Sequence, residues 1–358
     1  MITLRNKIGQ MLIMGFAGSE IHGRSPVAEW LSQDGLGGVL LFDQDVSTGT
    51  YGKNLQNQLQ IKHLIHQLNQ YSAKSFAEDD NALPLLTAID YEGGAIDRLT
   101  HVAGSMTTMP AYEMTRLSPE ALDAELGEMA ETLKSLGFNL NFAPVVDLHM
   151  HEQHGIIGAL HRSFSDDPDT VIRMARQFVE VFRRKGIASC YKHFPGHGSA
   201  LGDTHEGFVD VSETFQRAEL APYFQLVNDV YQPTMIMTAH VINKHLDPQG
   251  LPATLSHDIL TGLLRETMGY DGIIISDDLQ MQAIADHYSV DEALRLTINA
   301  GADMIIFANQ LDSITAPEVI ERIERLVLEH KIDPHRIDEA YRRVVRLKQQ
   351  ITCIELMK

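Results

Sequence analysis

Short apolar runs alternate along the chain with longer stretches in which apolar residues recur every three or four positions. Short apolar runs bounded by polar, Gly or Pro residues are typical of buried parallel strands, whereas the longer period is that of an amphipathic helix. Eight runs have the strand pattern: residues 11–16, 38–42, 85–89, 139–146, 187–191, 234–238, 272–275 and 303–307. We therefore expect eight strands with helices between them.

Eight such units are the number of a closed parallel (β/α)8 barrel of the TIM type, and this is the fold class that the pattern predicts. The runner-up, an open doubly wound sheet, usually carries a Gly-rich turn after its first strand, but the segment 35–38 precedes a predicted strand. A boundary in the polar stretch 72–81, a candidate surface loop, would leave a first piece too small to close a sheet. We expect residues 1–358 to form one barrel domain, with last helices near 317–329 and 334–350.

Polar residues directly follow most of the predicted strands. They are Asp90, Asp147, Lys192, His193, His240 and Asp277. The carboxyl ends of barrel strands form the rim where such enzymes build their active sites. A carboxylate there is able to attack an electrophilic carbon, although an Asp-Asp pair at a strand–helix junction also serves as a helix cap. Asp277 is thus a candidate nucleophile, with Asp278 as the candidate cap.

The segment 191–205 has the most distinctive chemistry. Pro195, Gly196 and Gly198 disfavour both helix and regular strand, which predicts a loop at a strand end. Asp203 and His205 stand two residues apart, close enough for the carboxylate to orient an imidazole that acts as general acid/base. The alternative is a turn aspartate beside a surface histidine.

Charge and cysteine content restrict the class of protein. The net charge is −19, from 48 acidic and 29 basic residues, and no run rich in Lys or Arg is present, which argues against nucleic acid and anionic membrane as partners. Cys190 and Cys353 have neither disulfide-framework nor metal-ligand spacing. The first residues lack the apolar core of a signal peptide, and no stretch is long enough to span a bilayer. We expect a cytoplasmic protein that binds a small, neutral or modestly charged ligand.

A competing pattern is His149-Met150-His151, directly after Asp147-Leu148 and followed by Glu152 and His154. Alternate residues of an extended segment point the same way, so a His-x-His pair at a barrel strand end is able to bind a divalent metal. On spacing alone this pattern favours a metal-dependent hydrolase. No comparable second histidine pair follows it.

Seven segments together resemble the bacterial β-N-acetylglucosaminidase branch of glycoside hydrolase family 3. The resemblance extends through most of the chain, over Lys7-Ile8-Gly9-Gln10-Met11, Ile89-Asp90-Tyr91-Glu92-Gly93-Gly94, Asn141-Phe142-Ala143-Pro144-Val145-Val146-Asp147, Arg162-Ser163-Phe164, the segment 192–198, Pro252-Ala253-Thr254-Leu255-Ser256 and Ser276-Asp277-Asp278-Leu279. Each segment alone is weak, whereas the ordered set is specific.

This resemblance implies a (β/α)8 barrel that removes terminal β-linked N-acetylglucosamine with retention, through a covalent glycosyl-enzyme intermediate and without metal or cofactor. It implies Asp277 as nucleophile and His205, oriented by Asp203, as acid/base. The positions implied to bind the sugar are Asp90, Arg98, Arg162, Lys192 and His193. The implied substrates resemble N-acetylglucosaminyl-anhydromuropeptides, which places the expected activity in peptidoglycan turnover.

A histidine acid/base departs from the two carboxylates of most retaining glycosidases. Longer family relatives recruit their acid from an additional domain, so we expect this chain to supply it from a barrel loop. A neutral imidazole repels an anion less than a carboxylate does, which leaves phosphate open as the acceptor in place of water.

The chain also departs from the family pattern. Tyr91 replaces a frequent Gln, Ala95 replaces a frequent Arg, and the His-rich stretch 148–161 is longer than usual. A β-glucosidase of the same family and a non-catalytic sugar-binding barrel stay open as alternatives, beside the metal-dependent hydrolase.

Overall fold

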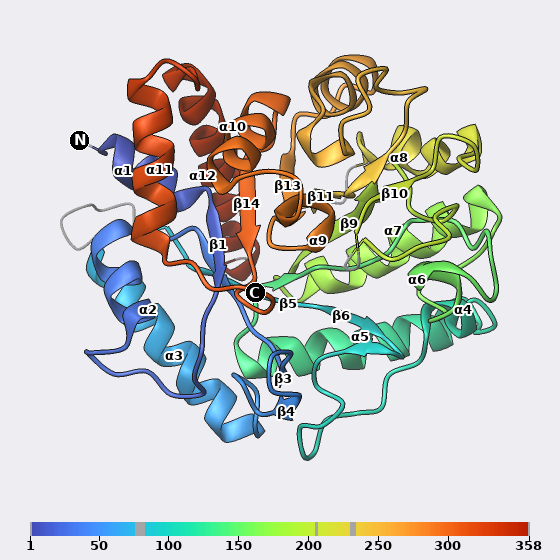
Figure 1. Ribbon diagram of the computed structural model, residues 1–358. Coiled ribbons are helices and arrows are strands. Elements are labelled where there is room, and N and C mark those ends of the chain that lie inside the picture. Colours follow the sequence, from blue (N-terminus) through green and yellow to red (C-terminus); the bar gives the residue numbers. More distant parts are fainter. Residues whose placement is uncertain (1, 76–82, 205–206, 230–233, 357–358) are drawn as a thin grey trace.

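The computed structural model describes residues 2–75, 83–204, 207–229 and 234–356, and shows a closed barrel of eight parallel strands with helices outside it (Figure 1). Around the barrel the strands follow the order β1, β14, β13, β11, β9, β8, β5, β2. Their bounds are β1 Leu12–Gly15, β2 Gly38–Leu40, β5 Leu86–Ile89, β8 Leu140–Asn141, β9 Ala188–Phe194, β11 Thr234–Thr238, β13 Ile273–Asp278 and β14 Met304–Phe307. The predicted fold class and all eight predicted strands are confirmed.

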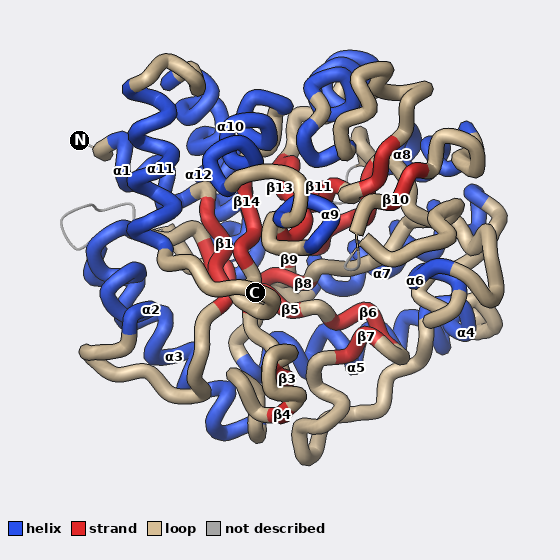
Figure 2. The backbone as a smooth tube through the Cα atoms, viewed as in Figure 1, coloured by secondary structure: helices blue, strands red, loops and turns tan. Residues whose placement is uncertain are grey.

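The helices surround the barrel and fill the segments between its strands (Figure 2). The α-helices are α1 Leu4–Gln10, α2 Pro26–Glu29, α3 Gln58–Ser75, α4 Ala111–Met114, α5 Pro119–Leu136, α6 Gly155–Gly158, α7 Pro168–Arg184, α8 Ala221–Leu226, α9 Gln282–Ala285, α10 Val290–Ala300, α11 Ala316–Leu328 and α12 Pro334–Leu356. Shorter 3-10 and π-helical segments are η1 Trp30–Asp34, η2 Arg217–Leu220, η3 Ala253–Leu255 and η4 Asp258–Thr267. None of the helices in the described part of the chain is both long and apolar enough to cross a bilayer.

Local sequence sets the ends of several of these helices. The side chain of Ser118 accepts a hydrogen bond from the Ala121 amide before α5, and Asp167 does the same for Thr170 before α7. Each cap satisfies an amide that has no partner within the helix. Helix α5 ends at Gly137, whose φ of 102° is in the region that favours glycine.

The barrel interior is filled by apolar side chains from its strands. Helix α12 adds Val344, Leu347 and Ile351 to the same buried cluster. Arg343 and Arg346 of α12 contact Asp271, which lies two residues before β13, so α12 covers the amino ends of the strands. The carboxyl ends therefore form the open end of the barrel, as expected for a TIM-type enzyme.

Three features differ from the predictions. Strand β9 continues to Phe194, which pairs with Thr238, so Lys192 and His193 lie within the strand rather than after it. Strand pairs β3 Gln44–Asp45 with β4 Thr50–Tyr51, β6 Tyr91–Gly93 with β7 Ile96–Asp97, and β10 Val209–Asp210 with β12 Val241–Ile242 were not predicted. The candidate loop at 72–81 begins as the last turn of α3, and residues 76–82 lie outside the described residues.

Candidate active site

A cavity of about 320 Å³ opens at the carboxyl ends of the barrel strands. Six of the predicted site residues line it: Asp90, Arg98, Arg162, Lys192, His193 and Asp277. The cavity also has apolar walls, formed by Leu40, Phe42, Val46, Ile96, Phe142, Ile156, Met237, Met281, Ile306, Ala308 and Leu311. A pocket of this composition suits a small ligand that has both polar groups and apolar faces.

Two carboxylates and two cations form a buried cluster on one wall. Lys192 Nζ lies 2.9 Å from Asp90 Oδ1 and 2.7 Å from Glu92 Oε1. Arg162 donates from Nε and Nη2 to the two oxygens of Glu92, at 2.8 and 2.7 Å. Although burial alone would raise the pKa of Glu92, Arg162 and Lys192 hold it well below its ordinary value. Glu92 is therefore ionised beside these two cations.

Arg98 extends this wall toward the cavity mouth. It lies 3.6 Å from Asp43 and 4.0 Å from Asp90, and its guanidinium group lies over the ring of Phe42. Its side chain is about one third exposed. Arg98 is thus the cation of this wall that is most accessible from solvent, among the described residues that line the cavity.

The buried carboxylate of Asp147 holds two neighbouring residues of the cavity wall, His193 and His197, in place. Its carboxylate accepts hydrogen bonds from the His193 amide, from His193 Nδ1 at 2.7 Å and from the His197 amide at 2.8 Å. Burial alone would raise the pKa of Asp147, but the two histidines and these hydrogen bonds hold it below its ordinary value. Burial and the neighbouring His193 lower the pKa of His197 to about 4, so its imidazole is neutral near pH 7.

Asp277 and Asp278 end strand β13 and have different surroundings. Asp277 is half-buried and lines the cavity, and its Oδ1 accepts the amide of Asp278 at 2.8 Å. Asp278 accepts the amides of Gln280 and Ala308, both at 3.1 Å. The N-cap of the next helix, α9, is Met281, so the expectation that Asp278 caps that helix is wrong. Asp278 instead ties the end of β13 to the residue after β14.

The predicted acid/base pair lies only partly within the described residues. Asp203 is half-buried, in the segment between β9 and β10, and the adjacent Thr204 lines the cavity. His205 lies outside the described residues. The Thr204 carbonyl accepts the amide of Ala283 in α9, so this part of the segment lies beside the first helix after β13.

The histidine-rich stretch does not form a metal centre in the described residues, where no three His, Cys, Asp or Glu side chains are grouped to hold an ion. His149 instead stacks on Tyr112, with 4.7 Å between ring centroids. The geometry therefore gives no support to the metal-dependent alternative built on His149 and His151.

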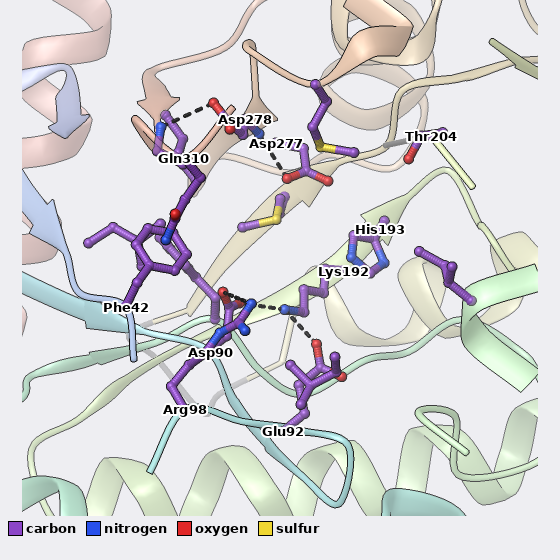
Figure 3. Close-up of a pocket in the computed structure, with 18 of the residues that line it drawn as sticks. Phe42, Asp90, Glu92, Arg98, Lys192, His193, Thr204, Asp277, Asp278 and Gln310 are labelled. Carbon is purple, nitrogen blue, oxygen red and sulfur yellow. Dashed lines mark hydrogen bonds and ion pairs between the residues drawn. The ribbon is translucent and has the colours of Figure 1, made fainter. Parts of the chain in front are cut away.

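Asp277 faces the cluster formed by Asp90, Glu92, Lys192 and Arg162 across the cavity, as Figure 3 shows for its labelled members. Strands β13 and β5, which deliver them, are opposite one another in the order of the barrel. A carboxylate on one side and a fixed array of donors and acceptors on the other are able to hold a polyhydroxylated ring with one carbon toward Asp277.

Comparisons with known proteins agree with this geometry. The family model described as glycosyl hydrolase family 3 N terminal domain matches residues 3–347. The chain belongs to glycoside hydrolase family 3. It is 30% identical over 351 residues to a beta-hexosaminidase A of Pseudoalteromonas piscicida, and 32% identical over 350 residues to a beta-hexosaminidase of Alkalilimnicola ehrlichii. These alignments cover 91% and 94% of this chain.

Solved structures of the same family share the fold. A β-N-acetylglucosaminidase from Paenibacillus sp. FPU-7 superposes with a TM-score of 0.84 at 30% identity, covering 98% of this chain and 63% of that one. A β-N-acetylhexosaminidase from Beutenbergia cavernae has a TM-score of 0.82 at 25% identity, covering 98% and 99%. The chain spans 55% of the length of the Pseudoalteromonas relative but 88% of the Alkalilimnicola one.

Sequence reasoning missed three residues of this family 3 site: Glu92, Asp147 as a support for histidines, and His197. A signal for Glu92 was present, because Asp90 and Glu92 stand two residues apart and alternate residues of an extended segment share a face. The role of Asp147 depends on a contact between β9 and the segment after β8, which no local pattern reports.

Proposed function

We propose that this protein is a retaining exo-β-N-acetylglucosaminidase. The observation that carries the proposal is the position of Asp277 in a cavity at the carboxyl ends of the barrel strands, opposite the Asp90–Lys192–Glu92 cluster, in a chain of glycoside hydrolase family 3. The printed activity of the relatives, beta-hexosaminidase, supports the choice of sugar.

In this proposal Asp277 attacks the anomeric carbon and forms a covalent glycosyl-enzyme intermediate. The bond between C1 and the leaving oxygen breaks as the bond to Asp277 forms, and a proton passes to the leaving oxygen from His205, oriented by Asp203. Water, deprotonated by the same imidazole, then attacks C1 and releases the carboxylate. Inversion at each of the two steps gives overall retention.

In this proposal the hydroxyl groups of the sugar bind the cavity wall that lies opposite Asp277. Asp90 accepts hydrogen bonds from hydroxyl groups, while Arg98, Lys192 and His193 donate to hydroxyl oxygens. Arg162 supports this array, because two of its donors are already engaged by Glu92. Holding the ring in this way is worth several kcal/mol of the barrier when the reacting carbon is presented to the nucleophile.

A direct assay tests the proposal. The protein should release chromophore from a chromogenic β-N-acetylglucosaminide at least about tenfold faster than from the matching β-glucoside, a difference of about 1.4 kcal/mol. EDTA should leave this activity intact. A preference for the glucoside, or activity that is lost with EDTA and restored by zinc, would replace the proposal with one of its alternatives.

We propose that the substrates of this activity are muropeptide fragments from peptidoglycan turnover. We also propose that they are processed in the cytoplasm. Assays that compare N-acetylglucosaminyl-anhydromuropeptides with chitooligosaccharides test which leaving group the enzyme prefers. Adding inorganic phosphate and identifying the product as free sugar or sugar 1-phosphate tests the acceptor.

A further inference from the structure

We propose that Glu92 is a positioning residue for the glycosidase reaction, and that it acts by holding the ammonium group of Lys192 against Asp90 and by balancing the charge of the sugar-binding wall. The inference rests on the proposed function, since the sugar is the ligand of that wall. It adds a specific task for Glu92, which lines the cavity beside the groups expected to contact the sugar.

Both oxygens of Glu92 are engaged by cations. Oε1 lies 2.7 Å from Lys192 Nζ and 2.7 Å from Arg162 Nη2, and Oε2 accepts from Arg162 Nε at 2.8 Å. The three side chains are 2–8% exposed. A bidentate contact with a planar guanidinium group fixes the orientation of a carboxylate as well as its position. Arg162 thus holds Glu92 rigidly, and Glu92 holds Lys192.

Glu92 determines where the Lys192 ammonium group lies. An ammonium group has three donors, and Lys192 directs two of them to Asp90 and Glu92, at 2.9 and 2.7 Å. One donor remains for a ligand. If Glu92 were removed, the flexible lysine side chain would be held by Asp90 alone, and both groups would lose the geometry in which Figure 3 shows them.

Glu92 also sets the charge of the wall. The four groups of the cluster, Asp90, Glu92, Lys192 and Arg162, carry two negative and two positive formal charges, and Arg98 at the cavity mouth lies 3.6 Å from the carboxylate of Asp43. Neutralising Glu92 would leave one net positive charge in a buried site, where charge interactions are stronger than in water. The intact wall therefore suits an uncharged sugar, whereas a wall without the Glu92 charge would favour an anion.

The charged groups around Lys192 give this proposal a pH signature. Burial lowers the pKa of Lys192, Asp90 after β5 and Glu92 in β6 raise it, and Arg162 after α6 lowers it, with a net increase above the ordinary value. Arg98 after β7 and Asp277 in β13 line the same cavity. Without the Glu92 charge, burial and Arg162 would oppose Asp90 alone, so Lys192 would lose its proton at a lower pH.

The test is Glu92→Gln, which keeps the shape of the side chain and removes its charge. We expect kcat/KM on the chromogenic β-N-acetylglucosaminide to fall by about 10²-fold, because the donor array shifts relative to the nucleophile. Because this leaving group needs little protonation, we also expect the alkaline limb of the kcat/KM profile, measured between pH 6 and 10.5, to lie at lower pH in the variant than in the wild type, where the pKa of Lys192 is raised above its ordinary value. Inorganic phosphate should inhibit this variant about tenfold more strongly than the wild type.

Two other variants separate this role from simple support of the fold. Glu92→Asp retains the charge on a shorter side chain, so kcat/KM should fall while the alkaline limb and the phosphate inhibition stay as in the wild type. Asp34→Asn is the matched control, because Asp34 is also a buried carboxylate paired with an arginine, Arg5, but does not line the cavity. It should lower stability without changing the pH profile.

Each outcome decides the question. An unchanged alkaline limb and unchanged phosphate inhibition in Glu92→Gln would overturn the proposal even if activity fell, since loss of support alone predicts that pattern. Should Glu92→Gln fail to fold, wild-type kcat/KM in Glu92→Asp would overturn it. A wild type with no activity on any β-N-acetylglucosaminide would instead refute the proposed function, which the pH comparison does not test.

Discussion

Asp277 and Asp278 are neighbours in sequence with different tasks. Asp277 faces the cavity, whereas the Asp278 carboxylate receives two backbone amides that join the ends of β13 and β14. This difference predicts opposite effects of two otherwise identical substitutions.

Asp277→Ala should abolish turnover, with a loss of about 10⁴-fold or more, and leave the unfolding free energy nearly unchanged. Asp278→Ala should cost about 2 to 3 kcal/mol of stability, because it leaves two buried amides without their acceptor. Steady-state kinetics and urea denaturation measure the two effects. Labelling with a mechanism-based fluorosugar, followed by peptide mapping, identifies the nucleophile, and a label on Asp278 would contradict the assignment.

The proposed acid/base allows a test that depends on the leaving group. A good leaving group needs little protonation, so His205→Ala should slow formation of the glycosyl-enzyme less with such a substrate than with a natural disaccharide. Release of the sugar should still be slow without a base, and azide should partly restore it and yield a β-azide. Asp203→Ala should add little to the loss, since residues that act as one unit share a single contribution.

Equal losses on both substrates, with no rescue by azide, would mean that His205 supports the segment or binds substrate and that the acid/base lies elsewhere.

At the scale of elements, the loop after β9 is fixed on both sides of Gly198. The preceding His197 amide donates to Asp147, and the following Ser199 amide donates to Glu219 at 3.1 Å. A Cβ atom at Gly198 would lie 2.2 Å from the Leu148 carbonyl oxygen. The close approach of two backbone segments explains why glycine occupies this position.

Gly198→Ala should therefore displace the loop and lower kcat by about 10²-fold, because small displacements near the reacting groups have large effects on rate. Gly202→Ala is the matched control in the same loop, since among the described residues its Cβ would meet only the flexible Val209 side chain, at 3.3 Å. It should retain most of the activity. Equal kinetics for the two variants, together with equal thermal unfolding, would show that the close contact with Leu148 does not control the site.

The elements differ in how far the sequence alone predicts them. Strand β11 was predicted with its correct bounds, because an apolar run flanked by polar residues reports burial on both faces of a parallel strand. The two-residue strands β3 and β4 have little such signal, since both are short and partly exposed. Asp90 and Asp277 were predictable as strand-end carboxylates, whereas the Glu92–Arg162 contact joins residues 70 positions apart.

At the scale of the whole molecule, the barrel has a buried charge at the end opposite the cavity. Lys348 of α12 is fully buried, and its ammonium group donates to Gln10 Oε1 at 2.7 Å. Burial lowers the pKa of Lys348 to about 7. A buried lysine is destabilising to the extent that its pKa is depressed, because the unfolded chain binds the proton more tightly.

The sign of the pH dependence follows from this depression. Between about pH 7 and 10.5 the unfolded state holds more protons than the folded state, so the wild type becomes more stable as the pH rises through this window. The gap between the folded-state and unfolded-state pKa values of Lys348 corresponds to about 5 kcal/mol, at about 1.4 kcal/mol for each pKa unit.

Lys348→Met removes the cost of burying this lysine. It also leaves Gln10 Oε1 without its donor, which offsets about 1 to 3 kcal/mol of the gain in stability. We therefore expect Lys348→Met to be more stable than the wild type at pH 7, with an advantage that shrinks toward pH 10. Urea denaturation at pH 6, 7, 8.5 and 10 measures the difference, and Lys62→Met, at an exposed lysine of α3, serves as the control that should show no such trend. A constant difference between Lys348→Met and the wild type across this range would mean that Lys348 keeps an ordinary pKa in the folded barrel.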